Sequence, residues 1–140
     1  RRSRGLGRPT MIVLDTHIWY WWINADHDRL SSAQSEAVRA SERVGVSAVS
    51  CFEMAQAVRR GKIELTVPLR EWFAKALDGS LIEVLPLTPA IPGRAVELTD
   101  RHRDPFDRTI IATALELDRQ LASADGQLPA YAELAGRLVV

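Results

Sequence analysis

Five acidic residues stand where a short apolar segment ends or where a helix is expected to begin. Asp15 closes the apolar run MIVLD, and Asp125 closes QLASAD. Glu53 follows the apolar run VGVSAV, while Asp104 and Asp107 lie on either side of a proline in RDPFDRTIIATA. If these carboxylates converge, they repel one another unless a cation lies between them. Oxygen ligands without several cysteines or histidines suit Mg²⁺ or Mn²⁺ rather than zinc.

Each acid, taken alone, also has a purely structural explanation. Asp104 suits the N-cap of a helix, Pro105 its first position, and Asp107 its positively polarised first turn. Asp15 could likewise cap a helix, Ser50 and Glu53 could form an S-x-x-E capping box, and Asp125–Gly126 could form a turn. Only the convergence of several acids would favour a chemical role.

The expected elements alternate between strands and helices. Strands are predicted at 11–15, 44–49, 81–87, 120–125 and 137–140, and helices at 17–24, 31–42, 50–60, 68–79, 89–99 and 104–118. This alternation predicts one α/β domain with a mainly parallel central sheet of about four or five strands, flanked by helices. Ligands bind beyond the carboxyl ends of such strands, so the five acids are expected at one rim of the sheet.

The composition is that of one globular domain. The chain has 140 residues, of which 46% are hydrophobic and 26% charged. No apolar run approaches the roughly 20 residues that span a membrane. A signal-peptide core is absent, and the single Cys51 cannot form an intrachain disulfide. These features predict a cytoplasmic protein with no membrane partner.

The first ten residues differ from the rest in charge. Residues 1–10 contain four arginines and no acid, and they precede Met11. We interpret them as a tag or upstream remnant and expect them to be disordered. Without those four arginines, 14 basic residues face 18 acids, so residues 11–140 carry a net charge of −4. Nucleic-acid binding would therefore need local basic groups or metal ions rather than bulk charge.

Four segments together carry a family resemblance. LDTHIWYWW, SAVSCFEMA, HRDPFDRTIIATA and LASAD, in this order and at this spacing, resemble the PIN-domain family and most closely its VapC-type toxins. Those toxins are the ribonuclease halves of bacterial toxin–antitoxin pairs. The resemblance covers residues 11–140 and implies a Rossmann-like parallel sheet. It also implies an acidic site that binds Mg²⁺ or Mn²⁺ and cleaves RNA.

The resemblance assigns roles to individual residues. It implies that the catalytic acids are Asp15, Glu53, Asp107 and Asp125. Asp104 matches the toxin branch as an additional acid and metal ligand. Two hydroxyl residues, Thr16 and Ser123, are expected to support the site.

Hydrolysis of a phosphodiester requires an activated water, neutralised phosphate charge and a stabilised leaving oxygen, all of which divalent ions can supply. We expect Asp15, Asp107 and Asp125 to be the main metal ligands. Glu53 is expected either to bind the metal or to orient the attacking water. The sequence leaves open whether one or two ions bind.

Several basic residues could hold RNA phosphates, although each could equally belong to a solvated basic face. They are Arg59, Arg60, Lys62, Arg103 and Arg108. His17 could contact RNA or the metal's surroundings.

The aromatic run WYWW spans residues 19–22. Helical geometry spreads these side chains around more than half of the helix, so we expect only two of them in the core. The remainder would form an apolar patch of the kind that binds a protein, and we predict Trp19 and Trp22 as partner-binding residues. The resemblance implies a homodimer and a cognate antitoxin lying in an apolar groove, which we place on the helices at 17–24, 31–42 and 51–60.

Two rival functions remain open. A phosphatase could use Asp15 as a covalent nucleophile, but the sequence DTH has no second aspartate two residues on, and no lysine follows near the last acid. A catalytically silent PIN-like domain could instead bind protein through the Trp-rich surface. Such an adaptor has no physical reason to keep the full set of acids.

Overall fold

The sheet consists of five parallel strands. The computed structural model describes residues 8–99 and 104–140. The strands are β1 (Met11–Leu14), β2 (Arg43–Ser47), β3 (Glu83–Leu85), β4 (Gln120–Ala122) and β5 (Leu138–Val139). Their order is β3-β2-β1-β4-β5, and each neighbouring pair is parallel. The predicted α/β architecture with a parallel sheet is thus confirmed, and β1 lies at its centre.

Six α-helices connect and cover these strands. They are α1 (Thr16–Ile23), α2 (Ser32–Ala40), α3 (Ala48–Arg59), α4 (Leu69–Phe73), α5 (Ala90–Glu97) and α6 (Pro105–Leu117). Short segments add 3-10 turns at His27–Arg29, Leu128–Ala130 and Ala132–Leu134, and a π-helical turn at Ala74–Asp78. None of the helices within residues 8–99 and 104–140 has both the length and the apolar character needed to cross a membrane.

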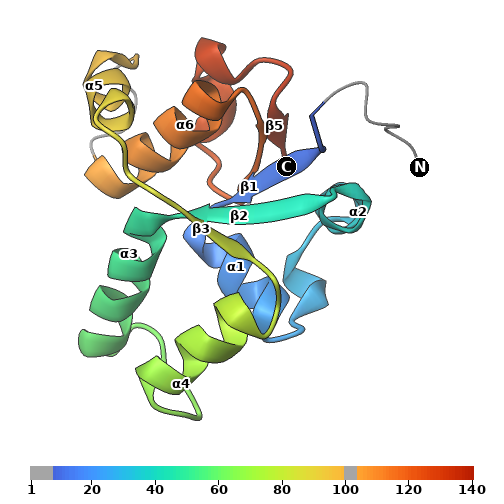
Figure 1. Ribbon diagram of the computed structural model, residues 1–140, viewed down its shortest axis with the longest axis vertical. Coiled ribbons are helices and arrows are strands. Elements are labelled where there is room, and N and C mark those ends of the chain that lie inside the picture. The colour runs from blue at the N-terminus through green and yellow to red at the C-terminus, as the bar shows by residue number, and fades with distance from the viewer. Residues whose placement is uncertain (1–7, 100–103) are drawn as a thin grey trace.

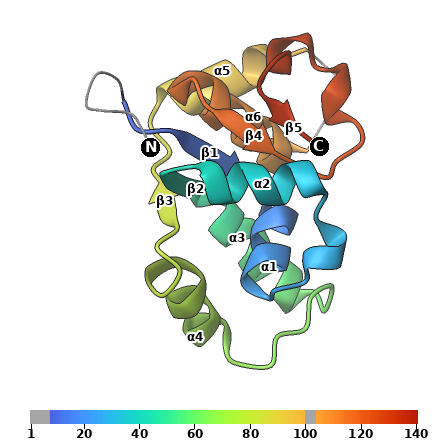
Figure 2. The ribbon, with the colours of Figure 1, turned by 90° about the vertical axis from the view of Figure 1, so that its right-hand side faces the viewer.

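Helices cover both faces of the sheet. Figures 1 and 2 show α5 and α6 on one face, with α1, α3 and α4 on the other. Alternate residues of β1 enter the two cores, because successive side chains of a strand point to opposite faces. Val13 packs with Ile110 and Ile111 of α6, whereas Leu14 packs with Trp19 of α1 and Met54 of α3. A strand buried on both faces explains the uninterrupted apolar run MIVL.

The start of α3 differs from its prediction. Ser47 is the N-cap, and its side chain accepts a hydrogen bond from the Val49 amide. Ser50 lies inside the helix and is fully buried. The predicted capping box between Ser50 and Glu53 is therefore wrong, because the helix begins three residues earlier. Glu53 consequently lies in the second turn and is not a cap.

The N-terminal segment before Met11 is partly ordered against the domain. The Thr10 amide donates to Glu42 Oε1 over 2.9 Å, and the Glu42 amide donates to Thr10 Oγ1 over the same distance. Arg8 donates to the carboxylate of Asp118 over 3.1 Å. Residues 8–10 thus differ from the expected disorder, and residues 1–7 lie outside the described part of the chain.

Candidate functional site

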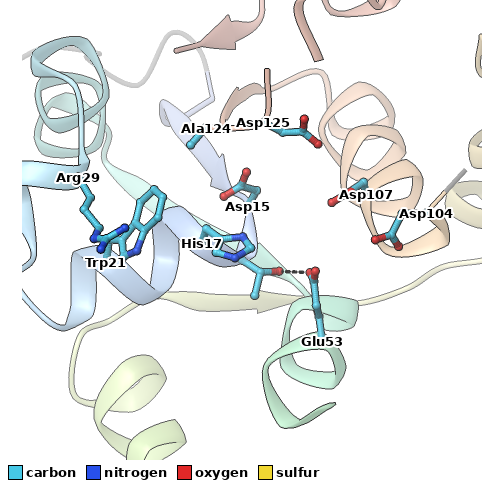
Figure 3. A pocket seen from close by; sticks show the side chains of 10 residues that line it. Asp15, His17, Trp21, Arg29, Glu53, Asp104, Asp107, Ala124 and Asp125 are labelled. Atoms are coloured by element: carbon cyan, nitrogen blue, oxygen red, sulfur yellow. Dashed lines mark hydrogen bonds between the residues drawn. The ribbon is translucent and has the colours of Figure 1, made fainter. Parts of the chain in front are cut away.

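The five predicted acids line one cavity at the carboxyl edge of the sheet. The cavity has a volume of about 550 Å³, and Figure 3 shows the carboxylates around it. They come from the end of β1, from α3, from the start of α6 and from the loop after β4. The lining is formed by Asp15, Thr16, His17, Trp21, Arg29, Glu53, Asp104, Asp107, Ala124 and Asp125. The convergence expected from the strand ends is therefore present.

Asp15 combines a structural and a site position. It is the N-cap of α1, and its Oδ1 accepts a hydrogen bond from the Ile18 amide over 2.9 Å. Its Oδ2 accepts from Ser123 Oγ over 2.5 Å. Burial raises the pKa of Asp15, while these hydrogen bonds and the nearby charge of His17 act in the opposite direction. Both oxygens are thus held in place at the base of the cavity.

Ser123 links Asp15 to the loop that carries Asp125. Its Oγ donates to Asp15 and accepts from the Asp125 amide over 3.0 Å. Asp125 Oδ1 in turn accepts from the Gln127 amide over 2.9 Å, which fixes the turn. The buried Gln34 side chain donates to the Ser123 carbonyl over 3.0 Å. Ser123 therefore joins Asp15 to the loop of Asp125, and its supporting role in the reaction stays a prediction.

Thr16 orients Glu53 and joins it to Ser50. Thr16 Oγ1 lies 2.5 Å from Glu53 Oε1 and 2.9 Å from Ser50 Oγ. An ionised carboxylate can only accept, so the single hydroxyl proton of Thr16 goes to Glu53. The proton between the two hydroxyls must then come from Ser50. This chain of hydrogen bonds directs the Glu53 carboxylate toward the cavity (Figure 3).

The tightest group of acids is formed by Glu53, Asp104 and Asp107. One oxygen from each lies within 4.8 Å of the other two. Asp104 caps α6 by accepting from the Phe106 amide over 2.9 Å, and Asp107 occupies the first turn of the same helix. Asp15 and Asp125 line the same cavity outside this triplet.

Electrostatics at the triplet favour a bound cation. The pKa of Glu53 is raised, first by burial and further by the negative charges of Asp104 and Asp15. The hydrogen bond from Thr16 and the charge of His17 lower it. A divalent cation would relieve the repulsion among these carboxylates, and their oxygens are the ligands that Mg²⁺ and Mn²⁺ prefer. The residues present therefore fit such an ion.

The predicted RNA-binding residues fall into separate groups. Arg60 and Lys62 line a second cavity of about 460 Å³, which adjoins the first by sharing His17, Glu53 and Asp104. Arg59 is exposed at the end of α3 and lines neither of these two cavities. Arg103 lies outside the described residues.

Arg108 has a structural position instead of the expected RNA contact. Its guanidinium donates to the carbonyls of Ala95, Leu98 and Thr99 over 3.1, 2.9 and 3.1 Å. These three acceptors lie at the end of α5 and just after it. The contacts use donors on both terminal nitrogens and on Nε, so Arg108 joins α5 to α6. This position contradicts its assignment to RNA phosphates.

Trp19 is fully buried, which contradicts its placement in an exposed partner-binding patch. Its indole donates to the Ala76 carbonyl over 3.1 Å, and its ring packs edge-on against Trp72. Trp22 is only partly buried, with the guanidinium of Arg39 5.7 Å from its ring centroid. Of the two predicted residues, Trp22 alone is accessible.

Three residues of the site were missed by reasoning from the sequence. Trp21 follows His17 by four residues, a spacing that places both on the same side of a helix and could have revealed it. Ser50 was assigned to a cap that lies elsewhere. Arg29 reaches the cavity from the turn at His27–Arg29, and no local pattern in the sequence announces it.

Comparisons with known proteins identify the family of this chain. The family model described as PIN domain matches residues 12–134. Over 123 residues the chain is 33% identical to Ribonuclease VapC22 of Mycobacterium tuberculosis, a match that covers 87% of this chain and 92% of that protein.

Solved structures with low sequence identity share the fold. VapBC2 from Rickettsia felis, bound to a DNA fragment from its promoter, has a TM-score of 0.65 and 16% identity, covering 92% of this chain and 97% of that one. VapC20 of M. tuberculosis, described as a toxin that cleaves the sarcin-ricin loop, has a TM-score of 0.58 and 19% identity, with coverages of 87% and 97%. The family model and the 33% identical relative together establish that this chain belongs to the PIN-domain family.

Proposed function

We propose that the protein is a metal-dependent endoribonuclease, the toxin component of a toxin–antitoxin pair, with residues 11–140 as its nuclease domain. The observation that carries the proposal is the convergence of five carboxylates on one cavity at the carboxyl edge of the sheet. The family membership and the ribonuclease name of the 33% identical relative support the same reaction. We place this activity in the cytoplasm.

The carboxylates would hold Mg²⁺ or Mn²⁺. The triplet of Glu53, Asp104 and Asp107 supplies the closest oxygens, and Asp15 and Asp125 complete the ring around the cavity. When bound, such a cation lowers the pKa of water and neutralises charge on phosphate oxygens. This assignment moves Glu53 into the metal-binding group, whereas the sequence favoured Asp15, Asp107 and Asp125 as the main ligands.

Glu53 would either bind the cation or orient the attacking water. Thr16 holds one of its oxygens at 2.5 Å, so the carboxylate cannot rotate freely away from the cavity. Ser123 positions Asp15 in a similar way.

We further propose a cognate antitoxin and a homodimer as the protein partners. Two of the solved structures that share the fold are toxin–antitoxin assemblies, from R. felis and Klebsiella pneumoniae. Trp22, partly exposed on α1, is the one of the two predicted partner-binding residues that remains available for such a partner.

The function is tested by incubating antitoxin-free protein with defined tRNAs and total RNA, in Mg²⁺ or Mn²⁺ and in EDTA. The proposal expects endonucleolytic fragments with either metal, no fragments in EDTA, and no cleavage of DNA oligonucleotides of the same sequences. Glu53→Gln should abolish cleavage, whereas Glu116→Gln, at the far end of α6, should leave it unchanged. Metal-independent cleavage that persists in Glu53→Gln would contradict the proposal.

A further inference from the structure

The side of the cavity away from Asp104 and Asp107 has a different chemical character. Trp21 and Arg29 line it, and His17 lies beside Trp21 toward Glu53 (Figure 3). We call these three residues the Trp21 wall. In Figure 3, Trp21 and Arg29 lie on one side of Asp15, and Asp104 and Asp107 lie on the other. A single cavity thus offers carboxylates on one side and an aromatic, basic surface on the other.

The Trp21 wall is built from two segments. His17 and Trp21 are one turn apart on α1, with ring centroids 5.7 Å apart. Arg29 comes from the turn that follows α1, and its guanidinium carbon lies 5.6 Å from the centroid of the Trp21 ring. An ion pair of 3.1 Å between Arg29 Nε and Asp26 holds the arginine there, although its side chain stays 62% exposed. The guanidinium is therefore positioned yet reachable.

Structural needs alone do not account for this arrangement. An exposed ion pair such as Arg29–Asp26 contributes little to stability. Trp21 is only partly buried, so part of a large aromatic side chain faces the cavity instead of the core. Among the described residues that line this cavity, Arg29 supplies the one arginine or lysine side chain.

A nucleotide matches what the Trp21 wall offers. Bases of single-stranded nucleic acid stack on tryptophan rings, and arginine adds both cation–π attraction and a phosphate contact. A phosphate approaching five carboxylates meets repulsion, which a guanidinium at the opposite side offsets. Bases within a duplex are already stacked and cannot lie against such a ring.

We propose that the Trp21 wall binds one nucleotide of a single-stranded RNA segment, next to the phosphodiester that the acids cleave. The base lies against the Trp21 indole, and Arg29 contacts the adjoining phosphate. This inference rests on the proposed ribonuclease function and assigns Trp21 and Arg29 to the binding of one nucleotide of its RNA substrate.

The test measures RNA binding separately from cleavage. Binding of a fluorescein-labelled, single-stranded 12-nucleotide RNA of randomised sequence is followed by anisotropy in Mg²⁺, with every protein also carrying Glu53→Gln so that the RNA stays intact. Trp21→Leu, which keeps apolar bulk, should weaken binding about tenfold or more, because stacking of one base is lost. Trp21→Phe should recover most of this loss.

Arg29 provides an independent test, because replacing this exposed side chain does not disturb the core. Arg29→Ala should weaken binding and lower the slope of log affinity against log salt concentration by about 0.7, the value for one phosphate contact on a single strand. The matched control is Arg39→Ala, because Arg39 lies 5.7 Å from the Trp22 ring but outside this cavity. Arg39→Ala should change neither affinity nor slope.

Cleavage assays with variants that keep Glu53 distinguish a failure of this inference from a failure of the proposed function. Trp21→Leu and Arg29→Ala should raise KM more than they lower kcat, and a fully paired RNA duplex should compete poorly. If both variants cleave RNA at the wild-type rate and keep the wild-type RNA affinity and KM, the proposed nucleotide site is wrong. The proposed ribonuclease function would be unaffected by that result. Thermal unfolding of Trp21→Leu checks that this variant is folded. If it is not folded, the results for Arg29→Ala alone test the nucleotide site.

Discussion

Asp107 lies both at the start of a helix and within the proposed metal site. It lies in the first turn of α6, where a negative charge suits the helix dipole, and one of its oxygens is within 4.8 Å of oxygens of Glu53 and Asp104. Helix initiation explains an acid at this position but not its neighbours from other segments. Both the helix-start position and the metal-binding role of Asp107 were predicted from the sequence, since Asp104 and Asp107 lie on either side of Pro105.

Replacing Asp107 with Asn should separate these roles. Asn tolerates the start of a helix, so we expect the unfolding free energy to change by less than about 1 kcal/mol. RNA cleavage should be lost, because the charge near Glu53 and Asp104 is gone. Gel assays of cleavage and denaturant unfolding provide the two measurements.

The matched control is Glu116→Gln on the same helix, where Glu116 forms a surface ion pair of 2.9 Å with Arg94. Its loss should cost at most about 1 kcal/mol and leave cleavage intact. Retained activity in Asp107→Asn together with a large loss of stability would show that Asp107 serves the fold alone.

Glu53 makes stability without metal depend on pH. Its pKa is raised in the folded protein, so between the ordinary and the raised pKa the folded state binds more protons than the unfolded state. The unfolding free energy therefore falls as the pH rises through this range. In EDTA, the melting temperature of Glu53→Gln should decline less than that of the wild type as the pH rises above about 4, the ordinary pKa of a glutamate.

Adding Mg²⁺ should raise the melting temperature of the wild type at the upper end of this pH range, because a ligand that binds only the folded state stabilises it. Identical pH profiles for wild type and Glu53→Gln in EDTA would contradict the electrostatic account of the cavity.

At the scale of elements, α5 and α6 are joined by Arg108. Its guanidinium donates to three carbonyls at and beyond the end of α5. The sequence placed this arginine near the acids correctly but could not show its direction, since neighbouring residues of a helix point about 100° apart. A basic residue next to a catalytic acid is therefore weak evidence for substrate contact.

Arg108→Gln tests this correction. We expect the unfolding free energy to drop by about 2 kcal/mol, because hydrogen bonds from a charged donor are lost and carbonyls lose their partners. The affinity for single-stranded RNA and its salt slope should stay unchanged in folded protein. A reduced salt slope without loss of stability would restore Arg108 to the RNA-binding group.

Most element types could be predicted, whereas several boundaries could not: the strand predicted at 81–87 spans only Glu83–Leu85, and the start of α3 is shifted. The segment SAVS contains two serines, Ser47 and Ser50, and either can cap a helix. The tertiary structure selects Ser47, because a helix that starts there buries Ser50 against Thr16 and turns Glu53 toward the cavity. The local helix-capping propensities of the two serines do not predict that Ser47 is the N-cap.

At the scale of the whole molecule, β1 fixes both the core and the site. Its residues Met11–Leu14 are all buried, and Asp15 follows at the carboxyl edge where the other acids also lie. The rim was predictable from the alternation of strands and helices. The Trp21 wall was not, because Arg29 reaches it through a turn whose path depends on the packed molecule.

Only the folded molecule shows which residues of the WYWW run lie in the core and which lie near the surface. We expect Trp22→Ser to weaken the complex with the cognate antitoxin, since Trp22 is partly exposed, and to lower thermal stability less than a substitution of the buried Trp19. Trp19→Ala should instead lower the unfolding free energy by about 3–5 kcal/mol, as for other buried tryptophans. Calorimetric titration with antitoxin and thermal unfolding distinguish the two. Unaltered antitoxin affinity in Trp22→Ser would remove this residue from the interface.

We propose that carboxylates from four separate segments form one divalent-cation site. A calorimetric Mn²⁺ titration of the antitoxin-free protein and of Asp15→Asn, Asp107→Asn and Glu116→Gln tests this site. We expect saturable Mn²⁺ binding in the wild type and Glu116→Gln, and markedly weaker binding in the other two variants, although their residues lie on different segments. If the wild type binds no Mn²⁺, or if all four proteins bind it equally, the five carboxylates do not form such a site.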